Sequence, residues 1–210
     1  MRLVSEIRVI YCDVGGVLLT NGWDHNIRRR VIEKFGLDLA AFEARHEEPN
    51  DAWEKGKITI DEYLTQTVFY EPRKFTREAF VRAMRDESQV LYPDNIRLIS
   101  QLRLSGRYTV AMLNNESAEL NEYRIQQFKL QECFDCYFSS CYLGLRKPHA
   151  EIYHVALKLL QRPSQECVFI DDRPENVAGA VSAGIHGIHF ESTSQLRAEL
   201  EKIGVRVPAA

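Results

Sequence analysis

Carboxylate, amide and ammonium side chains stand at four separate points of the 210-residue chain: Asp13, Asn114-Asn115, Lys147 and Asp171-Asp172. Adjacent carboxylates repel one another and are costly to bury unless a cation lies among them. A nucleophilic carboxylate, hydrogen-bond donors, an ammonium group and a divalent cation are the parts that phosphoryl transfer requires. Ligands that are all oxygen atoms fit Mg²⁺ better than Zn²⁺. We therefore expect Mg²⁺-assisted chemistry on a phosphate group if the fold brings these four points together.

The first point lies in residues 10–19, where Asp13 follows a short apolar run and precedes Gly15 and Gly16. A carboxylate in this place is held at the edge of a sheet, and the glycines let backbone N–H groups approach an anion closely. An ordinary Asp-Gly turn at the end of a strand explains the same residues. Because this segment alone fits both interpretations, the other three points decide between them.

The elements that must position these side chains are predicted from short apolar runs and from capped amphipathic stretches. We predict strands at residues 7–12, 108–113, 136–139, 167–170 and 187–190, and helices at about 93–104, 117–128, from 148, 174–184 and 193–204. Ser117 is a candidate helix cap, and Pro148 and Pro174 are placed in the first turns of their helices. The alternation of strands and helices after residue 91 predicts a parallel sheet, whose carboxyl edge would collect all four points.

Residues 21–89 interrupt this alternation and predict only helices, at 24–35, 39–54, 60–67 and 76–86. We therefore expect an α/β fold in which residues 1–20 and 90–210 form the sheet core and residues 21–89 form a helical cap inserted after the first strand. The aromatic residues of 62–69 and 75–80 follow helical spacing, which indicates the core of the cap itself. Its position after a strand's carboxyl end makes the cap a candidate lid.

The four points occur in the order and with the surroundings of the motifs of the haloacid dehalogenase-like (HAD) superfamily, which the chain resembles over nearly its whole length. The matching segments are Asp13-Val14-Gly15-Gly16-Val17, Asn114, Lys147 and Ile170-Asp171-Asp172-Arg173-Pro174-Glu175-Asn176. The resemblance implies a Rossmann-like core with a helical cap, and it implies hydrolysis of a small phosphorylated metabolite through an aspartyl-phosphate on Asp13.

The resemblance also implies a role for each position. Asp13 would be the nucleophile and a Mg²⁺ ligand, with Gly15 supplying a backbone carbonyl, Asp172 the second carboxylate, and Asp171 ligating directly or through water. Lys147 would bridge the nucleophile and the phosphate. The phosphate would lie against the backbone of Gly15 and Gly16, Asn114 and the following Asn115.

Two positions depart from the family pattern. Phosphatases of the family usually have a second aspartate, a general acid/base, where this chain has Gly15, and Ser or Thr where it has Asn114. The amide of Asn114 donates as a hydroxyl does, whereas general acid–base assistance is typically worth about 10²–10⁴-fold. The bacterial α-D-glucose-1-phosphate phosphatase subgroup, which the chain resembles in its Arg-Lys-Pro and Asp-Asp segments, also lacks this aspartate. That likeness suggests a sugar phosphate.

Three interpretations follow from the missing acid. A phosphatase could take its proton from elsewhere, with Asp24, His25 and Glu116 as candidates. A haloacid dehalogenase expels halide without protonation, but in that branch of the family no metal is used and the Asp171-Asp172 pair would stay uncompensated. A phosphate-binding protein with weakened catalysis is the third. We favour the phosphatase.

Other features bear less on the chemistry. A net charge of −3 and a pI of about 6.1 give no reason to expect binding to nucleic acid, and we interpret residues 28–30 as a solvated helix turn. The first residues predict no signal peptide and no run predicts a membrane span. The five cysteines, with Cys133-x-x-Cys136 among them, indicate packed reduced thiols, so we expect a cytoplasmic protein. No feature predicts an oligomeric state. Trp23, Asp24 and His25 could face the substrate, although such residues at a helix start more often pack or cap. Arg146 is expected either to contact the phosphate or to lie on the surface beside Lys147, and His149 and His154 to be structural or exposed.

Overall fold

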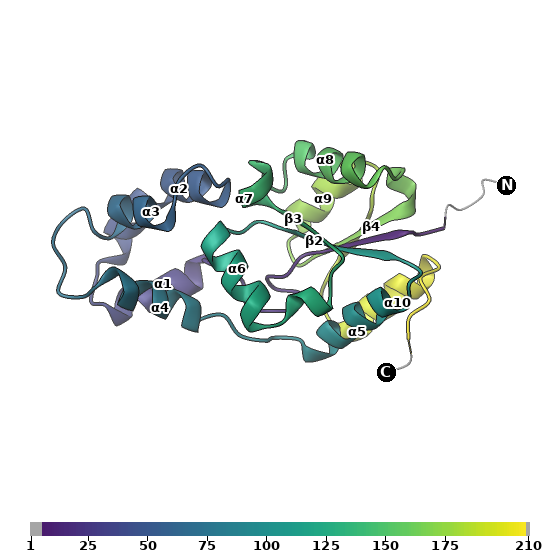
Figure 1. The fold of residues 1–210 in the computed structure, drawn as a ribbon, viewed down its shortest axis with the longest axis horizontal. Coiled ribbons are helices and arrows are strands. Elements are labelled where there is room, and N and C mark those ends of the chain that lie inside the picture. Colours follow the sequence, from purple (N-terminus) through teal and green to yellow (C-terminus); the bar gives the residue numbers. More distant parts are fainter. Residues whose placement is uncertain (1–5, 209–210) are drawn as a thin grey trace.

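The computed structural model describes residues 6–208, which form a five-stranded, wholly parallel sheet with helices on both faces and a helical extension at one end (Figure 1). The strands are β1 (Val9–Cys12), β2 (Thr109–Asn114), β3 (Cys136–Ser139), β4 (Cys167–Asp171) and β5 (His186–His189), in the order β3-β2-β1-β4-β5. β1 is therefore central, with β2 and β4 beside it. This arrangement is the predicted α/β fold with a Rossmann-like core.

The inner strands β1, β2 and β4 are buried on both faces, which explains why they occur as continuous apolar runs, whereas β5 is largely exposed. Alternate residues of β1 enter different hydrophobic clusters: Ile10 and Cys12 belong to one, Val9 and Tyr11 to the other. Helices α5 (Pro93–Leu104) and α10 (Thr193–Lys202) cover the first face, and α8 (Ala150–Leu160) and α9 (Pro174–Ser182) the second (Figure 1). The sheet is thus a rigid support for whatever stands at its carboxyl edge.

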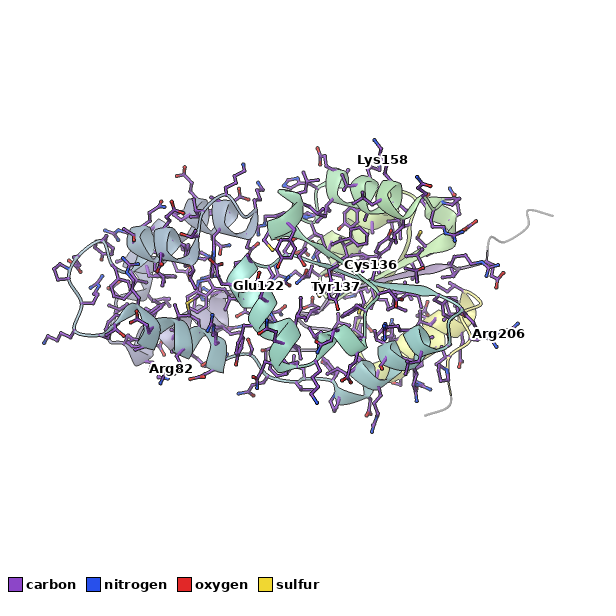
Figure 2. The ribbon with its side chains drawn as sticks, viewed as in Figure 1. Arg82, Glu122, Cys136, Tyr137, Lys158 and Arg206 are labelled. Carbon is purple, nitrogen blue, oxygen red and sulfur yellow. The ribbon has the colours of Figure 1, made fainter. Side chains whose placement is uncertain are left out.

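The cap, meaning residues 21–89, contains helices α1 (His25–Lys34), α2 (Leu39–Glu54), α3 (Ile60–Thr67) and α4 (Arg77–Asp86). Its apolar residues form a hydrophobic cluster, in which aromatic residues of the predicted segments, Tyr63, Phe69, Phe75 and Phe80, pack together and which also contains Leu120 from outside the cap. Charged residues such as Arg82 of α4 and Lys158 of α8 lie on outer surfaces (Figure 2). A cluster centred on the cap, distinct from the two clusters on the faces of the sheet, is in line with a core-and-cap division, and that division stays a prediction.

Two antiparallel segments connect the cap to the core. Thr20 N donates to Gln89 O at 2.8 Å and Leu91 N donates to Leu18 O at 3.0 Å, so the chain leaves and returns at the same place. A second connection is α6 (Ala118–Gln127), whose Glu119 accepts hydrogen bonds from the indole of Trp53 and the backbone of Ile60. Cap and core are therefore held together by named hydrogen bonds as well as by the link itself.

Most predicted element bounds agree with the structure within two residues, with three local differences. Ser117 stands at the N-cap position of α6 without a side-chain capping bond, and Pro148 precedes α8, which begins at Ala150. The short helix α7 (Ser140–Leu143) was not predicted, since four residues show no helical period. His149 and His154 are exposed, and all five cysteines are free. No helix within residues 6–208 is long and apolar enough to cross a membrane.

Candidate active site

The register of the sheet brings three of the four chemical points together at its carboxyl edge. Cys12 pairs with Ile170, so the residues that follow them, Asp13 and Asp171, come off adjacent strands at the same level. Oxygen atoms of Asp13, Asp171 and Asp172 lie within 4.8 Å of one another. Lys147 comes from the loop after α7, and its Nζ lies 2.6 Å from Asp171 Oδ2 and 3.0 Å from Asp13 Oδ1. The predicted convergence is present in the structure.

The two carboxylates of the Asp171-Asp172 pair have different surroundings. Asp171 is fully buried, and both of its oxygens accept hydrogen bonds from Asn176 Nδ2, with Arg173 N and Lys147 Nζ as further donors. Asp172 Oδ1 is buried with no hydrogen-bond partner in the described part of the chain. An unpaired buried carboxylate oxygen is costly. Asp172 is thus the residue whose bonding fits a cation, while Asp171 holds Lys147.

Electrostatic crowding alters the protonation of the site. Burial raises the pKa of Asp13 to about 7; Lys147 opposes this rise, and the neighbouring Asp171 and Asp172 add to it. Burial alone would lower the pKa of Lys147, but the two carboxylates that it contacts raise it. The single positive charge of Lys147 neutralises only part of the negative charge of Asp13, Asp171 and Asp172. The donor set, which is all oxygen and partly uncompensated, fits a hard divalent cation such as Mg²⁺.

Gly16 is required by its backbone and by close packing, and Gly15 packs against Asn21. Gly16 has a φ of +70°, and a Cβ there would lie 2.0 Å from Asp172 Oδ2, so only glycine fits. A Cβ on Gly15 would lie 2.7 Å from Asn21 Oδ1. The side chain of Asn21 therefore fills the direction in which an aspartate at position 15 would begin.

Asn114 and Asn115 use their amides within the protein. Asn114 Nδ2 donates to Asn121 Oδ1 at 3.1 Å, which leaves its second N–H for a ligand. The amide of Asn115 forms two hydrogen bonds of 2.9 Å with the backbone N–H and C=O of Lys147. Asn115 therefore positions the lysine, and its second amide N–H and its backbone are left for a ligand.

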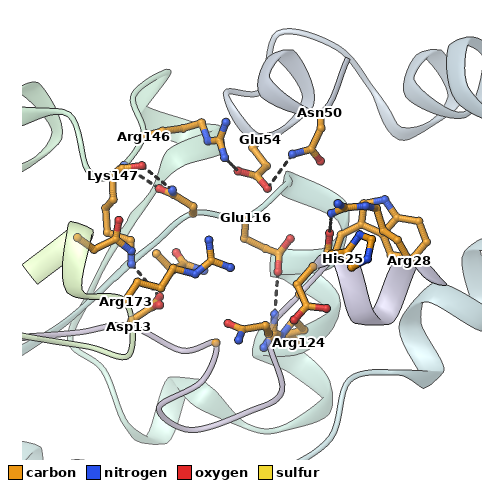
Figure 3. A pocket seen from close by; sticks show the side chains of 18 residues that line it. Asp13, His25, Arg28, Asn50, Glu54, Glu116, Arg124, Arg146, Lys147 and Arg173 are labelled. Carbon is orange, nitrogen blue, oxygen red and sulfur yellow. Dashed lines mark hydrogen bonds and ion pairs between the residues drawn. The ribbon is translucent and has the colours of Figure 1, made fainter. Parts of the chain in front are cut away.

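A cavity of about 340 Å³ opens beside this cluster and extends to the cap (Figure 3). Its walls combine residues from the carboxyl edge of the sheet, from α1 and α2, and from α6. Trp23 is the one apolar side chain among the following lining residues: Asp13, Gly15, Asn21, Gly22, Trp23, Asp24, His25, Arg28, Asn50, Glu54, Asn114, Asn115, Glu116, Arg124, Arg146, Lys147, Arg173 and Asn176. The volume is suited to a small polar molecule.

Comparison with known proteins agrees with this geometry. The sequence profile of haloacid dehalogenase-like hydrolases matches residues 7–184. The chain belongs to this family. Flavin mononucleotide hydrolase 1 of Arabidopsis thaliana is 30% identical over 82% of this chain and 69% of its own. Sesquiterpene phosphatase astK of Aspergillus oryzae is 28% identical over 96% of this chain and 98% of its own.

Solved structures share the HAD fold. A HAD family enzyme of Bacteroides thetaiotaomicron, in complex with magnesium and inorganic phosphate, superposes with a TM-score of 0.73 at 21% identity, over 90% of this chain and 98% of that one. A dehalogenase superposes with a TM-score of 0.62 at 23% identity, over 88% and 85% of the two chains. At such identities the likeness concerns the fold alone.

The three proton-donor candidates of this HAD hydrolase all line the cavity, but their bonding differs. Asp24 Oδ1 caps α1 by accepting from Ile27 N. Burial raises the pKa of Glu116, yet each of its oxygens accepts a hydrogen bond, one from Arg124 and one from Ser117 N. His25 Nδ1 lies 3.2 Å from Glu43 Oε1, and its Nε2 has no partner within residues 6–208. His25 is therefore the candidate with an uncommitted nitrogen.

Two arginines of the cavity are ion-paired, whereas Arg29 and Arg30 are exposed, as expected for the turn at residues 28–30. Arg28 is not solvated: its side chain is 13% exposed and binds Glu43 through two nitrogens, at the wall of the cavity. Arg146 bridges to the cap, with Nη1 2.9 Å from Asp51 Oδ1 and Nη2 2.6 Å from Glu54 Oε2. Helix burial patterns alone do not reveal such pairs, because their partners are distant in sequence.

Several cavity residues were not singled out from the sequence. Asn50 and Glu54 stand one turn apart on α2 and face the core, a spacing that the sequence does display. Arg124 follows Glu116 by two helical turns and pairs with it at 2.8 Å. Arg173 lies inside the fourth motif without a family role, so the motif itself gave no reason to select it.

Proposed function

We propose that the chain is a Mg²⁺-dependent phosphatase that hydrolyses a small phosphorylated metabolite through an aspartyl-phosphate on Asp13. The observation that carries the proposal is the bonding of two carboxyl groups at one sheet edge. Asp13 has one oxygen on Lys147 and the other without a protein donor in the described residues, while Asp172 has a buried oxygen without any partner. The first is a nucleophile with a free lone pair, and the second is a cation ligand.

In this mechanism Asp13 Oδ2 attacks phosphorus, an O–P bond forms, and the bond to the leaving oxygen breaks with its electron pair. Lys147 holds Asp13 and neutralises charge, and the free N–H of Asn114 donates to a phosphate oxygen. Mg²⁺, held by Asp13, Asp172 and the Gly15 carbonyl, would stabilise charge on the transferred group. His25 is the residue best placed by its bonding to protonate the leaving oxygen. Water then hydrolyses the aspartyl-phosphate and releases phosphate.

The two other interpretations have less support. A metal-free dehalogenase would leave the unpaired Asp172 oxygen unexplained. The interpretation as a binder with weakened catalysis depends on the absence of an aspartate at position 15. In the structure the side chain of Asn21 occupies the space into which such an aspartate would extend from Gly15. Both relatives at about 30% identity are named for hydrolysis of a phosphate compound or for phosphatase activity, which favours turnover.

A substrate panel tests the proposal directly. Purified protein is given sugar 1-phosphates, sugar 6-phosphates, nucleotides, p-nitrophenyl phosphate and 2-haloacids, each with Mg²⁺ and with EDTA. We expect release of phosphate that requires Mg²⁺ and no release of halide. Hydrolysis unaffected by EDTA would contradict the mechanism, and halide release would favour the dehalogenase.

The Mg²⁺ site is predicted to depend on Gly16. Gly16→Ala and Gly36→Ala both place a methyl group at positive φ, +70° and +64°, and each should cost about 1–2 kcal/mol of stability. Only Gly16→Ala pushes on Asp172, because the space around Gly36 is empty. We expect Gly16→Ala to lower activity by about 10–100-fold and to lose the Mg²⁺-induced rise in Tm. Differential scanning fluorimetry with and without Mg²⁺ distinguishes the variants, and an equal Mg²⁺ response in both would refute the assignment.

The leaving group is proposed to be polar and rich in hydroxyl groups, as in a sugar phosphate. Asn50 is 9% exposed and lines the cavity, where its Nδ2 donates to Glu54 Oε1 at 3.2 Å while its Oδ1 is buried without a partner in the described chain. A buried acceptor of this kind is satisfied by a donor on the substrate. The single apolar lining residue, Trp23, gives little surface for a hydrocarbon group.

Asn50→Leu is therefore expected to change selectivity. One lost hydrogen bond of about 0.5–1.5 kcal/mol predicts a rise in KM of about 2–10-fold for the best hydroxylated substrate, with p-nitrophenyl phosphate unchanged. Steady-state kinetics on both substrates gives the ratio, and Asn26→Leu, at an exposed asparagine of α1, serves as control. Equal effects on both substrates would show that Asn50 does not contact the leaving group.

A further inference from the structure

The arginine and lysine side chains that line the cavity are ion-paired within residues 6–208, with one exception. Arg28 pairs with Glu43, Arg124 with Glu116, Arg146 with residues of α2, and Lys147 with Asp13 and Asp171. Arg173 has neither an ion pair nor a side-chain hydrogen bond within the part of the chain that the structure describes. Figure 3 shows its side chain extending past Asp13 into the cavity. Among the described arginines and lysines that line the cavity, Arg173 is therefore the one available to a bound anion.

The backbone of Arg173 is fixed although its side chain is exposed. Arg173 N donates to Asp171 Oδ1 at 2.8 Å, and Pro174 follows at the first position of α9. Asp171 Oδ2 accepts from Lys147 Nζ. A single buried carboxylate thus anchors both the lysine and the start of the arginine side chain, so the two cations share one support.

The charge of the site requires a further cation when a phosphate ester binds. Three carboxylates and one ammonium leave an excess of two negative charges, which a divalent cation balances. A phosphomonoester dianion then adds two more, in a transition state that spreads charge over three equatorial oxygens. Lys147 already contacts two carboxylates. The guanidinium group forms two parallel hydrogen bonds to phosphate oxygens, for which its planar geometry is suited.

We infer that Arg173 is a phosphate-binding residue of this enzyme, which closes over the transferred phosphoryl group and neutralises charge that Lys147 and the metal leave uncompensated. This inference rests on the proposed function for the identity of the bound group. Arg173 is assigned to the phosphoryl group and not to the leaving group. The other arginines of the cavity, Arg28, Arg124 and Arg146, are already paired with carboxylates.

The test measures phosphate binding separately from turnover. Arg173→Gln and Arg173→Lys are compared with Arg107→Gln, an exposed arginine just before β2, at the opposite edge of the sheet. Inorganic phosphate is titrated by calorimetry in the presence of Mg²⁺, and the best substrate of the panel is used for kinetics. For Arg173→Gln we expect phosphate affinity to fall by about 10–100-fold and kcat/KM by about 10²–10³-fold, with the Mg²⁺-induced Tm shift retained. Arg173→Lys should recover part of both, and Arg107→Gln should match the wild type.

Chemical rescue adds a readout that a structural role would not move. Guanidinium at millimolar concentration should raise the activity of Arg173→Ala and leave Arg107→Ala unchanged. Unaltered phosphate affinity in Arg173→Gln would overturn the inference while phosphatase activity stands. An effect confined to substrates with a second anionic group, with inorganic phosphate unaffected, would also overturn it. If the wild type binds phosphate through Arg173 but hydrolyses no ester, the inference holds and the proposed function fails.

Discussion

Asp13→Asn is expected to abolish turnover and, without Mg²⁺ at pH 8, to raise the melting temperature. The amide cannot attack phosphorus, so kcat should fall by on the order of 10³-fold or more. Its neutral side chain also removes one of three crowded carboxylates, whose repulsion contributes to the raised pKa of Asp13. Activity and thermal stability therefore move in opposite directions, which a folding defect would not produce.

The measurement combines phosphate release, phosphoenzyme trapping and thermal unfolding. Wild-type protein quenched during turnover should carry an acid-stable, hydroxylamine-sensitive phosphate that Asp13→Asn lacks. Asp86→Asn, which changes an exposed aspartate at the end of α4, controls for the loss of a charge elsewhere. Activity of Asp13→Asn within tenfold of the wild type would mean that another group is the nucleophile.

The fold and the four chemical points could be predicted because both depend on short-range patterns. Fully buried strands are apolar runs, and parallel strands bring their carboxyl ends to one edge, which was enough to place Asp13 beside Asp171. Lys147 was predicted through its motif, although its loop is positioned by Asn115, whose two bonds to the Lys147 backbone have no sequence pattern.

The roles of individual polar side chains could not be predicted as well. Asp171 and Asp172 are neighbours with like chemistry, yet one is saturated by Asn176 and Lys147 and the other has an unpaired oxygen. Arg146 was considered for phosphate and is used by the cap. Each outcome depends on which partner lies across a loop or across the cap boundary, and that depends on tertiary packing.

The coupling between cap and active site follows from the same pairs. Arg146 precedes Lys147 in the chain and contacts α2 through Asp51 and Glu54, while Ser140 Oγ donates to Glu54 O at 2.7 Å. The loop that carries Lys147 is therefore held by the cap on one side and by Asp171 on the other. Removing Lys147 isolates the contribution of the second side.

Lys147→Met is expected to be the most destabilising single change at the site. The methionine fills similar volume, but Asp13 and Asp171 are left buried without their shared cation, a loss of about 3–5 kcal/mol by analogy with broken buried ion pairs. Turnover should fall as well, because the ammonium no longer holds Asp13 or meets the phosphate. Urea unfolding without Mg²⁺ gives the free energy of unfolding. Lys158→Met, on the exposed face of α8, is the matched control.

The pH dependence of this loss distinguishes electrostatics from packing. In the wild type without Mg²⁺ the folded-state pKa of Asp13 is raised from 3.8 to about 7, first by burial, so the folded state binds the proton more tightly than the unfolded chain. That stabilisation is complete below about pH 4 and is lost as the pH rises through 7. Lys147 lowers the pKa of Asp13 in the folded state, so this pKa is higher in Lys147→Met. The variant therefore continues to lose stability at a pH where the wild type no longer does. We therefore expect the variant to be destabilised least at pH 5, where Asp13 is protonated, and most at pH 8. If the loss of unfolding free energy in Lys147→Met were the same at every pH, the effect would come from packing. The charge pairing between Lys147 and the carboxylates would then not support the proposed acidic site.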